Sequence, residues 1–138
     1  MNIYFACSIT GGREFESVYQ AIVSKLVEAG HQVPTAHLAK SGVAAVEAVI
    51  DPVEVYERDV AWIRACDRLI AEVSVPSHGV GYEIGFALGI GKPVLVLFQE
   101  GRRVSKMISG NPDVNLQVRS YRDSARAMEL IREYLADD

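Results

Sequence analysis

The chain has 138 residues, of which 49% are hydrophobic and 23% are charged, a composition typical of one soluble globular domain. Its 18 acidic and 14 basic side chains give a net charge of −4, which argues against a surface that coats nucleic acid or an anionic membrane. No apolar run approaches the roughly 18 residues of a membrane span, and the first segment, MNIYFACSIT, lacks the features of a signal peptide. We therefore expect a cytoplasmic protein that binds neither nucleic acid nor membrane.

The first part of the chain alternates apolar segments with helical patterns. Residues 2–8 predict a strand, and after a glycine-rich loop a helix is expected over about 14–29. Residues 31–36 predict a second strand. Residues 39–50 are rich in alanine and valine without a clear period, so a mobile loop or a partial helix is expected there.

The second part of the chain begins with a clear helix start. Asp51, Pro52 and Glu54 provide an N-cap, a first-turn proline and a capping-box carboxylate, which predict a helix over about 52–66. The elements expected after it are, in order, a strand over 68–74, a helix over 82–91, strands over 92–98 and 115–121, and a helix over about 123–135.

This alternation predicts the fold class and the place of the site. Strands that alternate with helices favour an α/β fold with one parallel sheet of about five strands. We expect a single-domain flavodoxin-like (Rossmann-like) sandwich with strand order 2-1-3-4-5. Ligands bind such sheets at the carboxyl ends of the strands where the order reverses, here between the first and third strands. The segments SITGGR and SVPSHGVGYE leave those strands.

An acidic side chain interrupts the apolar face of the helix predicted over 52–66. At helical spacing that face contains Val55, Asp59, Trp62, Ile63 and Cys66. One reading is structural, because such an aspartate can cap a loop or pair with an arginine. The other is a partly desolvated acid with a raised pKa, which is suited to donating a proton.

A second carboxylate, Glu83, follows the third predicted strand in the first turns of the next helix. Backbone N–H groups and the helix dipole favour negative charge there, so we expect Glu83 to be ionised. By itself a first-turn glutamate is ordinary helix chemistry. Near one crevice with Asp59, it predicts divided acid and nucleophile roles, the pattern that cleaves glycosidic bonds.

Glycine-rich loops leave the same two strands. The segment GVGYEIG departs from the dinucleotide-binding fingerprint in position and spacing, so no nicotinamide cofactor is expected. Ser77 and Gly79 instead open onto a helix N-terminus, which can hold an anion with its backbone N–H groups. Ser8 and the Gly11–Gly12 turn face the same crevice. These residues predict a phosphate pocket, although serine and glycine are also ordinary turn residues.

Other polar side chains carry weaker signals. His37 follows the second predicted strand and could line the crevice, although a solvated or capping histidine is the commoner case. Cys7 and Cys66 have no CxxC spacing, and we expect two buried thiols. No spacing of metal ligands is present, so the sequence predicts neither a metal nor a cofactor.

A resemblance to a known family rests on three stretches: IYFACSITGGRE, ERDVAWIRACDRLIAEVSVPSHGVGYEIGFALGIGKPVLVLF and RVSKMISG. They resemble the 2′-deoxynucleoside 5′-phosphate N-hydrolases, a branch of the nucleoside 2-deoxyribosyltransferase superfamily. The resemblance runs nearly end to end and implies one such domain over 1–138. It also implies a hydrolase that splits (2′-deoxy)nucleoside 5′-monophosphates into free base and (2-deoxy)ribose 5-phosphate, without metal or cofactor.

The resemblance further implies a role for each site residue. Glu83 would be the nucleophile at the anomeric carbon, and Asp59 the acid that protonates the leaving base, in a retaining double displacement. The protein would be a homodimer in which Ser105 completes the phosphate site of the neighbouring subunit, and Met107 would lie beside the base. The other positions implied to bind substrate are Tyr4, Ser8, Ile9, Gly11, Gly12, Arg13, His37, Ser77 and Gly79.

One departure from the family pattern and two alternative functions accompany this interpretation. The family often has arginine where this chain has Thr10, so phosphate affinity or base choice is expected to differ. One alternative is deoxyribosyl transfer to a second base, in a pocket that excludes water until that base arrives. The other is a non-catalytic nucleotide-binding module in which Asp59 and Glu83 only hold ribose hydroxyls. Release of free base from nucleotides distinguishes an enzyme from such a module.

Overall fold

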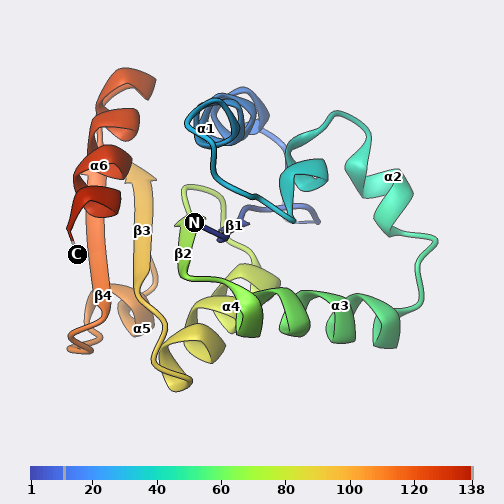
Figure 1. Cartoon of the computed structure of the whole chain (residues 1–138). Helices are drawn as coiled ribbons and strands as arrows, with labels where there is room; N and C mark the ends of the chain where they lie inside the picture. The colour runs from blue at the N-terminus through green and yellow to red at the C-terminus, as the bar shows by residue number, and fades with distance from the viewer. Residues whose placement is uncertain (11, 138) are drawn as a thin grey trace.

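A four-stranded parallel sheet organises the protein, as Figure 1 shows. The computed structural model describes residues 1–10 and 12–137, so the predicted site residue Gly11 lies outside the described residues. The sheet has the order β1-β2-β3-β4, with every neighbouring pair parallel. Its strands are β1 (Ile3–Ala6), β2 (Arg68–Glu72), β3 (Val94–Gln99) and β4 (Leu116–Tyr121).

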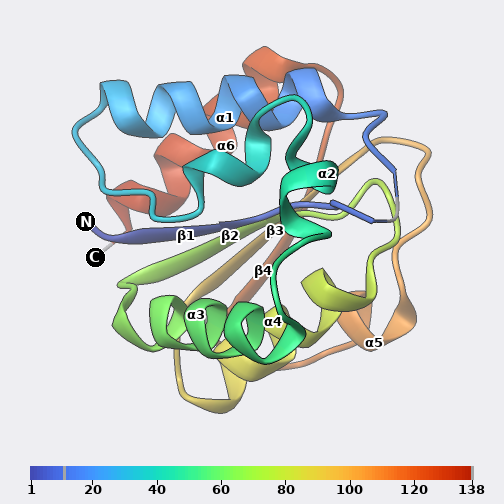
Figure 2. The same ribbon diagram turned by 90° about the vertical axis from the view of Figure 1, so that its right-hand side faces the viewer.

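Helices cover both faces of this sheet (Figure 2). One layer is formed by α1 (Glu16–Glu28) and α6 (Ser124–Ala136), and the opposite layer by α3 (Pro52–Ala65) and α4 (His78–Gly89). The side chains of β1 alternate between the two cores, with Phe5 beneath α1 and Tyr4 on the side of α3 and α4. Because both faces are covered, the strands read as nearly continuous apolar segments, which confirms the predicted α/β class.

Three short helices complete the description. They are η1 (Ala36–Ala39), α2 (Val43–Glu47) and α5 (Lys106–Ser109). In Figure 1, α2 lies beyond the β1 edge of the sheet, and the connection that follows it leads into α3. The segment 39–50, for which a mobile loop or a partial helix is expected, contains the short helix α2, so the partial helix is confirmed.

The predicted five-stranded sheet is wrong in one element. Instead of a strand over 31–36, a single parallel bridge joins Gln32 to Asn2, and η1 begins at Ala36. Pro34 has no N–H to donate to a ladder. The hydroxyl of Thr35 accepts the N–H of Phe5 at 3.0 Å, so a side chain occupies the edge position that strand pairing would have used.

The helix after β2 begins earlier than predicted. It runs from His78 to Gly89 instead of 82–91, because Ser77 is its N-cap and accepts a hydrogen bond from the Val80 N–H at 3.3 Å. Two glycines in its first four residues obscured this start in the sequence. Glu83 consequently lies in the second turn of α4 and not at its N-terminus.

The expected caps of α3 and α6 and the two expected buried thiols are confirmed. Asp51 caps α3 by accepting the Val53 N–H at 2.8 Å, and Asp123 caps α6 in the same way through Arg126. Cys7 and Cys66 are free and buried. Among the described residues, no helix combines the length and the apolar character needed to cross a membrane.

Candidate active site

Asp59 lies on the inward face of α3 and is paired with its neighbour Arg58. The guanidinium Nε of Arg58 donates to Asp59 Oδ1 at 2.9 Å, and the Asp59 side chain is 19% exposed. Burial raises the pKa of Asp59, while the Arg58 guanidinium opposes this effect. The raised pKa predicted for Asp59 is therefore confirmed in direction. The arginine pairing that was the structural alternative is present as well.

Glu83 points back over the first turn of α4. A Cβ atom placed on Gly79 would lie 3.7 Å from Glu83 Oε1 and 3.9 Å from Ser77 Oγ, so the carboxylate stands next to the helix start. Burial raises the pKa of Glu83 to about 7, with Tyr4 opposing the rise and the Asp59 charge adding to it. The helix dipole predicts an ionised Glu83, and burial opposes it by raising the pKa, although the carboxylate lies next to the helix start.

Tyr4 lies in the core next to both carboxyl groups. Its side chain is fully buried in the core between β1 and the α3–α4 layer. Both Glu83 and Asp59 raise the pKa of Tyr4, after the larger effect of burial, which places the phenol within the field of both acids. The Tyr4 hydroxyl has no hydrogen-bond partner by geometry among the described residues. The hydroxyl nevertheless lowers the pKa of Glu83 as a hydrogen-bond donor, so it is placed to donate to the Glu83 carboxylate.

The loop after β1 places a second unpartnered hydroxyl at the same edge. Ser8 is fully buried and its Oγ lacks a hydrogen-bond partner among the described residues. Gly12 has φ of +122°, a backbone conformation that residues with a side chain rarely adopt. Ile9 is partly buried and packs against the core on the α1 side, so its side chain faces away from Tyr4. Thr10 is exposed.

Arg13 does not present free donors to this loop. Its Nη1 donates to the carbonyl oxygens of Ser8 and Leu38 at 3.0 and 2.9 Å. Its Nη2 bonds the Lys40 carbonyl at 3.1 Å, and both Nε and Nη2 bond Glu16 Oε1. The side chain therefore fastens the segment containing η1 to the loop after β1. In this structure Arg13 holds two segments together, and its implied contact with substrate stays a prediction.

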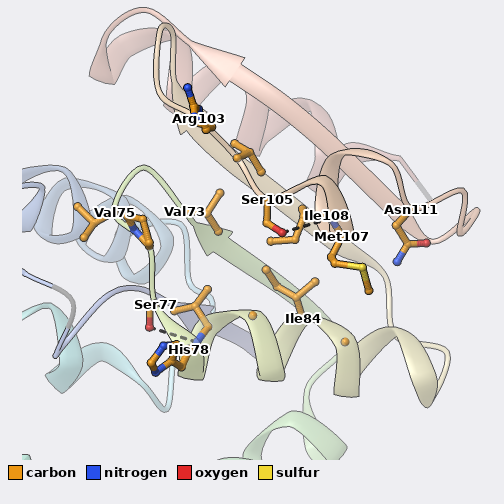
Figure 3. A pocket seen from close by; sticks show the side chains of 15 residues that line it. Val73, Val75, Ser77, His78, Ile84, Arg103, Ser105, Met107, Ile108 and Asn111 are labelled. Atoms are coloured by element: carbon orange, nitrogen blue, oxygen red, sulfur yellow. Dashed lines mark hydrogen bonds between the residues drawn. The ribbon is translucent and has the colours of Figure 1, made fainter.

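Ser77, Ser105 and Met107 line a cavity on another side of α4 (Figure 3). The cavity measures about 460 Å³, and its lining contains neither Tyr4 nor the two carboxyl residues. Ser105 caps α5 by accepting the Met107 N–H at 3.2 Å, and Met107 is 83% exposed. Within one chain, Ser105 and Met107 thus line the cavity between α4 and the segment that contains α5, together with the buried Val80 and Ile84, and neither carboxyl residue lines it.

His37 contacts a residue that the sequence did not single out. Its Nε2 lies 3.0 Å from Glu47 Oε1, and its ring packs edge-on against Trp62 with 5.9 Å between centroids. Glu47 also binds Arg58, whose Nη2 lies 3.1 Å from the same oxygen. His37 is therefore half-buried in a network and not simply solvated. Glu47 belongs to the segment without a clear period, so nothing in the local pattern pointed to it.

Metal ligation is not indicated in this region. Within residues 1–10 and 12–137, no group of three or more His, Cys, Asp or Glu side chains has the arrangement needed to hold a metal ion.

Comparison with known proteins identifies the family. The sequence profile described as nucleoside 2-deoxyribosyltransferase matches residues 3–130. The chain belongs to this family. A Methanosarcina mazei relative, provisionally named 2′-deoxynucleoside 5′-phosphate N-hydrolase 1, is 41% identical over 134 residues, which cover 97% of this chain and 83% of its own. Human 5-hydroxymethyl-dUMP N-hydrolase is 40% identical over 140 residues, with coverage of 98% and 80%.

A solved structure supports the same fold for this family member. The CMP N-glycosidase of Clostridium botulinum superposes with a TM-score of 0.72 at 22% identity, covering 96% of this chain and 98% of its own. The resemblance stated from the three sequence stretches is thereby confirmed at the level of the family. The carboxyl pair and Tyr4 lie inside the matched range, as do the capping serines of α4 and α5.

Proposed function

We propose that the protein hydrolyses the N-glycosidic bond of (2′-deoxy)nucleoside 5′-monophosphates. The observation that carries this proposal is the pair of partly buried carboxyl groups, Asp59 and Glu83, with raised pKa values beside the buried hydroxyl of Tyr4. Two carboxyl groups in distinct environments are what glycosidic cleavage requires. The names of the Methanosarcina and human relatives, both N-hydrolases of deoxynucleotides, support the substrate class.

The first step transfers the sugar to Glu83. Its carboxylate attacks the anomeric carbon and forms a glycosyl ester. The C–N bond breaks, and its electron pair leaves with the base, which takes a proton from the Asp59 carboxyl group. In the second step Asp59, now ionised, accepts a proton from water. The water oxygen attacks the anomeric carbon and releases Glu83, so the configuration of the sugar is retained.

These two reaction steps require one proton on the carboxyl pair, and that proton must be on Asp59. In the unliganded protein the pKa of Glu83 is raised to about 7 by burial, so Glu83 competes for the same proton. Above that pH the nucleophile is ionised, and the reaction then requires Asp59 to hold its proton beside Arg58. Tyr4 favours the ionised nucleophile, since its phenol opposes the rise in the pKa of Glu83.

The phosphate would be bound at the start of α4 and by the loop after β1. The α4 helix is 12 residues long and presents N–H groups at an end capped by Ser77. The buried Ser8 hydroxyl, which has no protein partner among the described residues, supplies a further donor.

A homodimer would complete this site. Within the chain Ser105 and the 83% exposed Met107 line the cavity that also contains Ser77, and the carboxyl pair lies outside that lining, so we assign both residues to the nucleotide site of the neighbouring subunit. The outer surface of α3 and α4 carries Tyr56 and Tyr82, which are more than half exposed and pack against each other. Exposed aromatic side chains of this kind are typical of subunit interfaces, and a cytoplasmic dimer is the assembly we propose.

The proposed function is tested by incubating the protein with deoxynucleoside and ribonucleoside 5′-monophosphates and separating the products by chromatography. We expect equal amounts of free base and sugar phosphate, and very poor cleavage of nucleosides without the 5′-phosphate. Addition of a second free base separates hydrolase from transferase, because a transferase forms a new nucleotide and a hydrolase does not. Tight nucleotide binding without release of base would identify a binding module and contradict the proposal.

A further inference from the structure

We propose that Glu47 and Arg58 form a positioning pair for Asp59, which orients its carboxyl group and lets it hold the proton that the reaction needs. The inference rests on the proposed function for its consequence. The interaction itself belongs to the folded protein and can be measured without any substrate.

A single guanidinium connects the two carboxylates. Arg58 Nε donates to Asp59 Oδ1 at 2.9 Å, while Nη2 and Nη1 donate to the two oxygens of Glu47 at 3.1 and 3.4 Å. The Arg58 guanidinium also lies over the Trp62 ring, 5.0 Å from its centroid. With one edge held by Glu47 and one face by Trp62, the guanidinium has a fixed direction, and so has the hydrogen bond that it gives to Asp59.

The orientation of α2 indicates that Glu47 is not a surface residue that happens to form an ion pair. The Glu47 side chain is 10% exposed, whereas Val46 and Val49 beside it are 59% and 85% exposed. Val43, one turn before Glu47 on the same face of α2, is buried, so Glu47 lies on the inward face of this helix. Here the carboxylate is turned inward, and its two oxygens contact Arg58 and His37.

Charged groups on every neighbouring element act on Asp59. Arg58 on α3 and His37 on η1 lower the pKa of Asp59, while Glu47 on α2 raises it. Glu83 on α4 is electrostatically coupled to Asp59, and Tyr4 on β1 lies beside both. If Arg58 interacted with Asp59 alone, its positive charge would hold Asp59 ionised and leave the proton on Glu83. Because Arg58 also binds Glu47, its charge lowers the pKa of Asp59 less, which favours protonation of Asp59.

The test uses two variants that must act in opposite directions. In Glu47→Gln, the whole Arg58 charge acts on Asp59, so the alkaline limb of kcat/KM moves to lower pH. In Arg58→Gln, the limb moves to higher pH. A displacement of about half a pH unit lowers or raises kcat/KM about threefold on the alkaline side. Glu57→Gln makes the same change of charge at an exposed position next to Arg58 and should leave the limb in place.

A second measurement is independent of activity. Titration of the Asp59 carboxyl carbon by NMR, assigned with Asp59→Asn, should show a lower pKa in Glu47→Gln and a higher pKa in Arg58→Gln, without substrate. If Asp59 titrates alike in all three proteins, the positioning pair is overturned. If the NMR titrations move as expected and the kinetic limb does not, the pair stands and the acid role of Asp59 in the proposed function fails.

Discussion

Replacing Glu83 by glutamine should remove activity and stabilise the protein at alkaline pH. Burial raises the pKa of Glu83 from its ordinary 4.5 to about 7. In the unfolded chain the group loses its proton near pH 4.5, whereas the folded protein keeps it until about pH 7. Stability is therefore lost as the pH rises through this window, because the folded state binds the extra proton.

The size of this effect follows from the difference in pKa. A difference of about 2.5 pKa units, at 1.36 kcal/mol each, corresponds to about 3 kcal/mol of stability above pH 7. Glu83→Gln has nearly the same shape and no charge, so it should avoid this penalty. For a domain of this size, about 3 kcal/mol corresponds to a rise of about 10 °C in Tm at pH 8, with little change at pH 4.5.

Thermal and urea unfolding of both proteins at pH 4.5, 6, 7 and 8 would measure the effect. The difference between Glu83→Gln and the parent protein should grow between pH 4.5 and 7 and then level off. Glu57→Gln, a change of the same kind at an exposed site, should show no such growth. A stability difference that is constant with pH, or a glutamine variant that is less stable at pH 8, would refute the argument that Glu83 is desolvated.

Three further predictions concern other parts of the site. Asp59→Asn should lose most of its rate on ordinary bases and regain much of it on a nucleotide whose leaving group needs no protonation, as measured by base release; equal losses on both would remove the acid role. Arg13→Ala should lower the unfolding free energy by at least about 2 kcal/mol, because four acceptors lose a charged donor, and a neutral result in urea unfolding would contradict the role of Arg13 in holding the two segments together. Mixed Ser105→Glu and Glu83→Ala subunits should regain activity as heterodimers, and verified heterodimers without activity would exclude a shared site.

The sequence predicted those parts of the fold that depend on local chemistry. Asp51 and Asp123 cap their helices as expected, and the buried strand β3 follows from an unbroken apolar segment. The predicted strand over 31–36 failed because a tertiary contact decided the outcome. The Thr35 hydroxyl takes the Phe5 N–H, and no periodicity in 31–36 reveals that partner.

The sequence likewise revealed some residues of the candidate site and missed others. Asp59 was found because a carboxylate on an apolar helical face is conspicuous in a sequence. The raised pKa of Glu83 was missed because it depends on where α4 starts and on what covers its second turn. Glu47 was missed because its importance comes from Arg58, eleven residues further along the chain and on another helix. Long-range burial and pairing of this kind are set by the assembled fold.

The central claim is that Glu83 forms a covalent bond to the anomeric carbon. A 2′-fluoroarabinosyl nucleoside 5′-monophosphate slows both displacement steps, so the intermediate should accumulate and be visible by intact-protein mass spectrometry. We predict a mass increase equal to the fluorinated sugar phosphate, located by peptide mapping on Glu83 and absent from Glu83→Gln. An adduct on a different residue, or release of base with inverted sugar configuration and no adduct, would contradict this account.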